Sequence, residues 1–186
     1  MSQQKVLVLV GDAAEELDAM YPIYRLRAAG YVADVAALTR RDVQLVIHDF
    51  DPNSDAYTEK NGRKLPVDVT FAEVDPADYT ALVIPGGRAP EYLRLNPQVL
   101  EMVRYFAGAN KPIGAICHAA QILAAAGVIK GRRINAYPAC SPEVTLAGGE
   151  FVSLEFTDAV TDGNFVTGPA WTAHVAWLRQ FLALLG

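Results

Sequence analysis

The sequence has few of the residues that mark secreted, metal-binding or redox proteins. Of its 186 residues, two are cysteine and three are histidine. Cys117 and Cys140 fit neither a zinc-binding pattern nor a disulfide framework. His48 has no clear acidic partner in the sequence, so the histidines give only weak evidence for a metal site. We therefore expect the protein to use no metal and no cofactor.

Long apolar runs and basic runs are also missing. The first apolar run, Val6 to Val10, is interrupted by Gly11 and Asp12, so it reads as neither a signal peptide nor a membrane span. The net charge is −5, and no stretch is rich in lysine or arginine, so nucleic-acid binding is not expected. These absences predict a cytoplasmic protein without membrane or nucleic-acid partners.

The composition is that of a globular chain. Hydrophobic residues make up 52% and charged residues 20% of the sequence, which is enough apolar material for a sizeable core. No internal repeat, linker or low-complexity tract divides the chain. We therefore predict a single domain over residues 1–186.

Short apolar runs alternate with stretches of helical periodicity, and this pattern predicts a three-layer, doubly wound and mostly parallel α/β sheet with a flavodoxin-like layout. The expected strands are 5–10, 32–38, 43–47, 67–71, 81–84, 113–116, 134–137, 159–161 and 165–167. The expected helices are 15–29, 97–109, 119–126, 141–147 and 172–185.

Two of these elements carry more detailed expectations. The first helix shows apolar residues at helical spacing, which predicts its buried face: Leu17, Met20, Ile23, Tyr24 and Ala28. The polar segment 48–65 is expected to be a hairpin or a long surface loop. Asn61-Gly62 is the turn signal within it.

The stretch 111–127 carries the strongest chemical signal. A buried strand over 113–116 runs directly into a helix that ends at Gly127, and Cys117 and His118 lie at the junction. A cysteine on such a turn faces the crevice at the carboxyl ends of the strands, and the helix N-terminus is expected to lower its pKa. The arrangement is similar to the nucleophile elbow of hydrolases. The alternative is a buried structural cysteine beside an unrelated histidine.

Adjacent glycines follow the expected strand 81–84. Gly86 and Gly87 allow the backbone to approach another group closely with its N–H groups exposed. A tight strand-to-helix turn explains the same residues. With Cys117 at the end of a neighbouring strand, however, these amides are candidates for an oxyanion hole.

Several motifs together resemble the ThiJ/PfpI family of the class I glutamine amidotransferase-like superfamily, and the resemblance covers nearly the whole chain. Segment 48–65 and the GPAWTAH ending are most similar to the branch with glyoxalase III or deglycase activity. The usual Cys-His-Gly-Pro is here Cys117-His118-Ala119-Ala120, which is expected to alter the first helical turn slightly. The matching pieces are KVLVLV from Lys5, MYP from Met20, ALVIPGGRAPEYLRLN from Ala81, AICHAAQILAAAGVIKGRR from Ala115, AYPAC from Ala136 and DGNFVTGPAW from Asp162.

The resemblance implies roles for individual residues. Cys117 is the expected nucleophile, and Glu15 is the expected buried acid that contacts the thiol, with Glu16 as the rival position. His118 is the expected third catalytic residue. Glu91 matches the acid that reaches a histidine across a subunit interface in the peptidase-named members. A dimer, or a larger assembly built from dimers, is also implied.

The same resemblance implies the surroundings of the thiol. The backbone amides of Gly87 and His118 are the expected oxyanion donors, with Gly86 beside them. Tyr137, Trp171 and His174 are the expected pocket residues. A glutamine amidotransferase is not expected, because such enzymes pair the cysteine with a downstream His-x-Glu and Ala176 stands at that position here.

Three functions remain open from the sequence. The first is an enzyme that acts on small aldehydes or dicarbonyls such as methylglyoxal through a Cys117 hemithioacetal. The second is an intracellular cysteine peptidase or amidase that uses the same thiol and oxyanion hole. The third is a redox-sensing stress protein whose exposed thiol oxidises readily.

Overall fold

The computed structural model describes residues 3–186. Seven strands form a central sheet in the order β10-β11-β7-β6-β1-β2-β5, and every neighbouring pair except β10–β11 is parallel. This is the doubly wound, flavodoxin-like sheet that the sequence predicts. The strands of the sheet are β1 (Lys5–Leu9), β2 (Val32–Ala37), β5 (Val69–Thr70), β6 (Ala81–Ile84), β7 (Ile113–Ile116), β10 (Val160–Asp162) and β11 (Phe165–Gly168).

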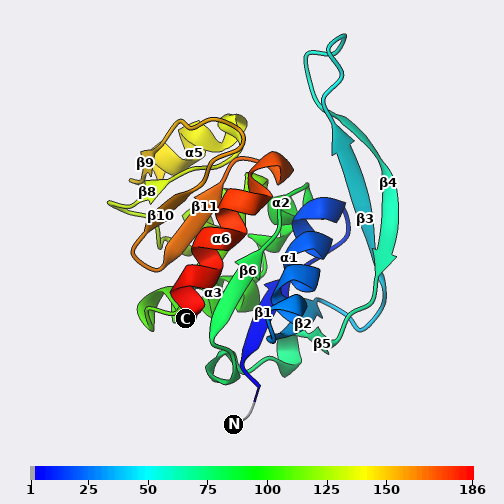
Figure 1. Ribbon diagram of the computed structural model, residues 1–186, viewed down its shortest axis with the longest axis vertical. Coiled ribbons are helices and arrows are strands. Elements are labelled where there is room, and N and C mark those ends of the chain that lie inside the picture. The colour runs from blue at the N-terminus through cyan, green and yellow to red at the C-terminus, as the bar shows by residue number, and fades with distance from the viewer. Residues whose placement is uncertain (1–2) are drawn as a thin grey trace.

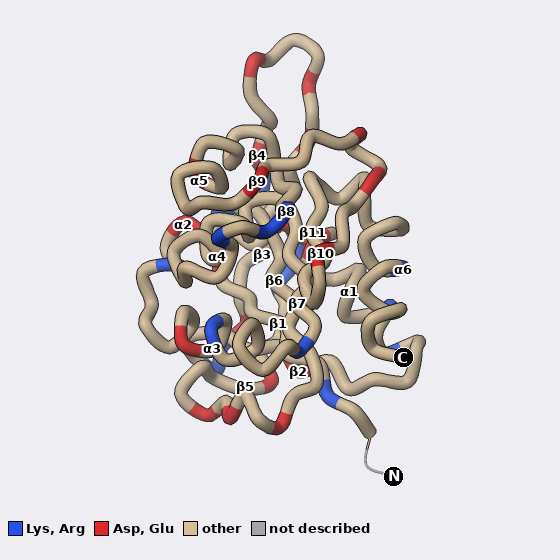
Figure 2. Tube along the Cα trace, turned by 90° about the vertical axis from the view of Figure 1, so that its left-hand side faces the viewer, with Lys and Arg blue, Asp and Glu red and all other residues tan. Residues whose placement is uncertain are grey.

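Helices cover both faces of the sheet. α1 (Glu16–Ala28) and α6 (His174–Leu185) lie side by side on one face. The other face carries α2 (Ala89–Leu93), α3 (Pro97–Gly108) and α4 (Ala120–Ala126), and α5 (Ser141–Leu146) packs against α4. Figures 1 and 2 show the resulting three layers from two directions. The inner strands β1, β6, β7 and β11 are almost fully buried, as parallel strands covered on both faces should be.

The packing around β7 fixes the position of Cys117. Gly114 lies in this strand, and a Cβ there would stand 3.1 Å from the rings of Trp177 and Phe181. Glycine therefore lets α6 approach the strand closely. On the other face, α4 begins at the end of β7 and ends at Gly127, whose φ of 75° gives the expected left-handed C-cap.

The segment 43–65 is a hairpin, but its turn is not where the sequence places it. β3 (Val43–Asp49) and β4 (Thr58–Leu65) pair antiparallel, and residues 50–57 form the tip. This hairpin stands beside α1 and projects beyond the sheet (Figure 1). Asn61-Gly62 lies inside β4, so the predicted turn is wrong. Gly62 instead allows a close approach, because a Cβ there would stand 2.5 Å from Glu16 Oε2.

The buried face of α1 is also rotated relative to the expected one. Leu17 and Tyr24 are 49% and 57% exposed, because the helix turns a different set of residues toward the sheet. The residues buried within α1 are Glu16, Asp18, Ala19, Pro22, Ile23 and Leu26.

Two smaller expectations near the carboxyl-terminal half need correction. The expected strand 134–137 is only β8 (Arg133–Ile134), which pairs with β9 (Glu150–Phe151) outside the central sheet. The sequence also suggests Ser141 as the cap of the helix 141–147, whereas Ser141 is the first residue of α5. Within residues 3–186, no helix is long and apolar enough to cross a membrane.

Candidate active site

Cys117 occupies the sharp turn that the sequence predicts between β7 and α4. Its φ is 58°, a left-handed conformation that costs on the order of 1–3 kcal/mol for a residue other than glycine. A short 3-10 turn, Cys117–Ala119, leads into α4. Such strain persists only where the surroundings enforce it, and it is typical of a nucleophile elbow.

The thiol is buried among polar groups. Sγ lies 3.3 Å from His118 Nδ1, and the Cys117 residue is 5% exposed. Burial raises the pKa of Cys117 well above its usual value, and the charge of Asp18 raises it further. The amides of Gly87 and His118 lower this pKa without overcoming burial. The expectation of a lowered pKa is therefore wrong, since desolvation outweighs the helix N-terminus.

Two glycines bring a loop against the thiol, as the sequence predicts. A Cβ on Gly86 would lie 2.4 Å from the Cβ of Cys117. Gly87 has a φ of 80°, and a Cβ there would lie 2.4 Å from the Ala13 carbonyl oxygen. The loop after β6 is thus wedged between Cys117 and the loop after β1, which directs the Gly87 amide toward sulfur and the Gly86 amide toward Asp18.

The carboxyl group beside the thiol belongs to Asp18. A Cβ added to Gly86 would lie 2.8 Å from Asp18 Oδ2 and 3.0 Å from Cys117 Sγ. Both side chains therefore approach the same point of the Gly86 loop. Asp18 is fully buried. Its Oδ1 contacts His174 Nε2 at 2.8 Å, whereas Oδ2 has no hydrogen-bond partner within residues 3–186. Burial raises the pKa of Asp18, although the hydrogen bond from His174 opposes the rise.

Glu15 has a different structural role from the one expected. It caps α1 by accepting a hydrogen bond from the Leu17 amide at 3.2 Å, and it accepts another from the His48 amide at 2.9 Å. Glu16 instead pairs with Arg63. In the described part of the chain neither glutamate is hydrogen-bonded to the thiol, so the predicted Glu15 contact, with Glu16 as its rival, is wrong.

A small aromatic pocket opens onto the thiol. Its volume is about 10 Å³, roughly the space of one water molecule. Tyr137 stacks on His118 with ring centroids 5.0 Å apart, and Tyr57 meets both rings edge-on. The expected pocket residues Tyr137 and Trp171 are therefore in place. The lining residues are His48, Phe50, Tyr57, Cys117, His118, Tyr137 and Trp171.

The β3–β4 hairpin is tied to the body by charged groups next to this pocket. His48 Nδ1 lies 3.1 Å from Glu15 Oε2, and His48 Nε2 lies 2.9 Å from Glu59 Oε2. Arg88, on the loop after β6, binds Glu59 at 2.6 Å. Arg88, followed by His48, lowers the pKa of Glu59 to about 2. Burial alone would lower the pKa of His48, but Glu15 and Glu59 outweigh burial and raise it.

Three other residues singled out from the sequence lie away from the pocket lining. His174 is buried behind the thiol against Asp18, so it does not line the pocket as expected. Glu91 is exposed on α2, where its expected contact with a neighbouring subunit stays a prediction. Cys140 is buried, and burial raises the pKa of its thiol to about 12.

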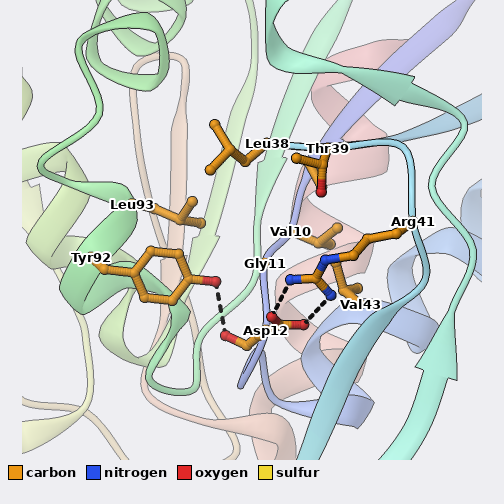
Figure 3. A pocket seen from close by; sticks show the side chains of 10 residues that line it. Val10, Gly11, Asp12, Leu38, Thr39, Arg41, Val43, Tyr92 and Leu93 are labelled. Atoms are coloured by element: carbon orange, nitrogen blue, oxygen red, sulfur yellow. Dashed lines mark hydrogen bonds and ion pairs between the residues drawn. The ribbon is translucent and has the colours of Figure 1, made fainter.

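A larger recess lies elsewhere. It has a volume of about 370 Å³ at the carboxyl ends of β1 and β2. In Figure 3, Arg41 is paired with Asp12, and the Tyr92 hydroxyl donates to the Asp12 carbonyl oxygen at 3.0 Å. The charged side chains of this recess, Arg41 and Asp12, form an ion pair with each other. The residues that line it include no cysteine or histidine. The cysteine and histidine singled out from the sequence therefore line the smaller pocket and not this recess.

Four site residues escaped the sequence reasoning. Asp18 lies on the buried face of α1, and a buried acid is a signal of function. The face of this helix expected to be buried did not include Asp18. His48, Phe50 and Tyr57 enter the site only because the hairpin folds over it. Their spacing in the chain carries no trace of this arrangement.

Comparison with known proteins assigns residues 4–184 to the family described as the DJ-1/PfpI family. Over the whole length of this chain, the sequence is 42% identical to DJ-1 homolog D of Arabidopsis thaliana. Over 97% of the length of this chain, the sequence is 36% identical to a deglycase of Pyrococcus horikoshii. The crystal structure of Drosophila melanogaster DJ-1beta superposes with a TM-score of 0.80 at 25% identity, covering 98% of this chain and 91% of that one.

These relatives differ in length. The chain spans 48% of the Arabidopsis protein but 99% of the Pyrococcus deglycase. It also spans 49% of a two-domain Anabaena variabilis protein, whose structure matches with a TM-score of 0.77 at 23% identity. The region compared here therefore occurs both as nearly a whole protein and as about half of a larger one.

Proposed function

Since this chain belongs to the DJ-1/PfpI family, we propose that it is a cysteine-dependent enzyme that converts small reactive aldehydes, such as methylglyoxal, without glutathione. The names of its archaeal relatives, which are deglycases, support this chemistry. One observation carries the proposal. The strained Cys117 faces two backbone amides, and the charge of the buried Asp18 carboxyl group acts on its thiol.

The first step is addition of sulfur to the aldehyde carbon. Cys117 rests as a thiol because its pKa is raised by burial, so it needs a base. Asp18, whose charge acts on the thiol, takes the proton as the sulfur–carbon bond forms. The aldehyde oxygen gains the negative charge, which the amides of Gly87 and His118 stabilise. Protonation of that oxygen by Asp18 gives the hemithioacetal.

The second step moves hydrogen between the two carbons of the former dicarbonyl. Burial lowers the pKa of His118 to about 4, with a further contribution from His48. His118 is therefore neutral near pH 7 and able to act as a base. It removes the proton from the sulfur-bearing carbon and returns it to the neighbouring carbon, while the hydroxyl proton of the hemithioacetal passes to the neighbouring carbonyl oxygen, which leaves the thioester of lactate. Water then cleaves the thioester to lactate and frees the thiol, so that methylglyoxal plus water gives lactate.

The pocket favours a small substrate. A volume of about 10 Å³ beside Cys117 holds about one water molecule, so every substrate, methylglyoxal included, requires the aromatic side chains to move. Phe50 and Tyr57 belong to the tip of the hairpin, residues 50–57, so this segment has to move when a substrate enters the pocket. A compact aldehyde requires the smallest displacement. Aldehyde adducts of amino groups, the deglycase type of substrate, use the same attack on carbon.

The test is formation of lactate from methylglyoxal in glutathione-free buffer. Wild-type protein should produce lactate, and Cys117→Ser should produce none above the uncatalysed rate. Cys140→Ala is the matched control, because it removes the other thiol and should retain activity. Equal rates for wild type and Cys117→Ser, or cleavage of peptides in place of lactate formation, would contradict the proposal.

A further inference from the structure

An open apolar groove lies beside the catalytic pocket, and the proposed reaction does not use it. The groove has a volume of about 340 Å³ and is lined by Phe50, Phe156 and Thr172. Phe50 is 44% exposed and Phe156 is 37% exposed. The Thr172 hydroxyl donates a hydrogen bond to the Phe156 carbonyl oxygen, which ties this side of the groove to the turn that carries Trp171. Exposed aromatic side chains gathered in one place are typical of a binding site.

Phe50 separates this groove from the thiol. Its side chain lines both the groove and the pocket of Cys117. Its ring stacks on Trp171 with centroids 4.9 Å apart and meets Phe156 edge-on with centroids 5.9 Å apart. Phe50 lies at the tip of the β3–β4 hairpin, the segment that has to move when a substrate enters. Movement of this ring therefore joins the pocket to the groove.

The two spaces differ in what they can hold. The pocket alone, at about 10 Å³, favours a compact aldehyde group, whereas a groove of about 340 Å³ is within the size range of small-molecule sites. An aldehyde carbon bound to Cys117 has its substituent directed outward, because the thiol lies at the buried end of the pocket. The substituent therefore meets the aromatic rings at the mouth.

We propose that the pocket and the groove form one substrate site, in which Cys117 takes the aldehyde carbon while Phe50 and Phe156 hold an apolar, preferably aromatic, substituent. This inference rests on the proposed function, because it names the class of aldehyde that the same thiol takes. Phenylglyoxal, in which a phenyl ring replaces the methyl group of methylglyoxal, is the simplest member of this class. Aromatic rings prefer stacked or edge-on contacts with one another, and the groove offers such contacts.

The charges around the groove favour a neutral substituent. Asp49 and Asp51 flank the first of the two phenylalanines, and Glu155 precedes the second; all three acids are exposed. Neither the hairpin tip nor the segment 152–159 contains a lysine or an arginine, and Figure 2 shows acidic residues along the tip. A carboxylate or phosphate on the substrate meets like charges at this rim. The site should therefore select against anionic aldehydes.

Reaction of Cys117 with maleimides tests the site without any turnover. N-phenylmaleimide carries an aromatic substituent and N-methylmaleimide does not, and both add to a thiol by the same reaction. Mass spectrometry follows the modification of Cys117, and the ratio of the phenyl to the methyl rate constant is compared with the same ratio for free cysteine. We expect the ratio for the protein to be about tenfold higher, the effect of one favourable aromatic contact. A carboxylated N-phenylmaleimide should react more slowly than N-phenylmaleimide, and this difference should shrink in about 1 M salt.

Phe156→Ala should bring the ratio to within about twofold of the free-cysteine value, because the ring on the body side of the groove is lost. Phe156→Tyr keeps an aromatic ring and should keep the high ratio. Tyr24→Ala is the matched control, because Tyr24 is 57% exposed on α1 and does not line the groove.

Several results would overturn the inference. A wild-type ratio equal to that of free cysteine would do so, whether the groove fails to hold the ring or a second copy of the chain covers it. An unchanged ratio in Phe156→Ala, or faster reaction of the carboxylated reagent than of N-phenylmaleimide, would do so as well. Absence of lactate formation by the wild type would instead refute the proposed function and leave these ratios interpretable.

Discussion

At the scale of single residues, the proposed reaction depends on the protonation states of Cys117, Asp18 and His118. His118 gives the simplest prediction. Burial, with the help of His48, lowers its pKa to about 4, whereas an unfolded histidine has a pKa near about 6.5. As the pH falls between these values, the unfolded chain binds a proton that the folded chain does not. Stability should therefore fall with acidification over this range, by an amount on the order of 3 kcal/mol.

About 2 kcal/mol of this loss falls between pH 7 and pH 5, where it is measured by urea unfolding. In His118→Asn, which has no titrating ring at this position, the acid-dependent loss of unfolding free energy should be clearly smaller. An equal loss in both proteins would show that His118 is not kept neutral by burial.

The misidentified acid shows what residue-scale sequence reasoning can and cannot achieve. Cys117, His118 and the glycine pair were predicted because they follow strands whose ends meet at one edge of the sheet. The acid depended on the rotation of α1, and the expected face placed Leu17 and Tyr24 inward. With Ala19, Ile23 and Leu26 inward, Asp18 becomes a carboxyl group on a buried face. The error lay in the position that the family resemblance assigned to the acid, Glu15, and the misplaced helical face did not reveal Asp18 as the alternative.

At the scale of elements, the β3–β4 hairpin acts as a wall that His48 fastens to the body. Burial would lower the pKa of His48, but its bonds to Glu15 and Glu59 raise it above the usual value. A raised folded pKa means that the stabilisation is fully present below the unfolded pKa of about 6.5 and is lost as the pH rises through the folded value. The hairpin attachment should weaken on the alkaline side.

His48→Gln tests this sign. The difference in unfolding free energy between wild type and His48→Gln should be largest near about pH 6 and should shrink as the pH rises. This is the opposite direction from the His118 effect, so the two histidines serve as controls for each other. A difference that grows with pH would contradict the ion-pair account.

Tyr57 should control access to the thiol. Its ring meets His48, His118 and Tyr137 edge-on at 4.7 to 6.0 Å, and such contacts are worth about 0.5–1.5 kcal/mol each. Tyr57→Ala should therefore speed modification of Cys117 by a bulky maleimide by about tenfold. Lys60→Ala, an exposed change on β4, is the control. Unchanged maleimide rates in Tyr57→Ala would mean that the hairpin does not limit access.

The hairpin also shows which features of the secondary-structure elements the sequence did not predict. The sequence indicated a hairpin or loop over 48–65, but the turn signal at Asn61-Gly62 misled because Gly62 serves the contact with Glu16. The alternation of strands and helices predicted the central sheet correctly, since that pattern is local. Packing of the hairpin over Cys117 is a long-range contact, and no local pattern encodes it.

At the scale of the whole molecule, exposed apolar residues support the expected assembly. Leu146 on α5 is 89% exposed and Leu95, just after α2, is 78% exposed. Arg94 and Glu143 join these two elements, and Glu91 is exposed on α2. This face is therefore apolar next to the acid that the family resemblance places at a subunit contact.

We expect the protein to sediment as a dimer or a larger assembly, and Leu146→Asp to weaken that assembly. Val175→Asp is the matched control, because Val175 is 71% exposed on α6, at the opposite face of the sheet. A monomer at every concentration would contradict the expectation. Dissociation by Val175→Asp alone would place the interface on the other face.

The central claim is that Asp18, and not Glu15, activates Cys117. The most direct test is the rate of lactate formation from methylglyoxal, in glutathione-free buffer, by Asp18→Asn and Glu15→Gln. Asp18→Asn should lower this rate by at least about a hundredfold, as expected when a general base is lost. Glu15→Gln, which only caps α1 and holds His48, should stay within about tenfold of wild type. Near-wild-type activity in Asp18→Asn, or a larger loss in Glu15→Gln, would contradict the account.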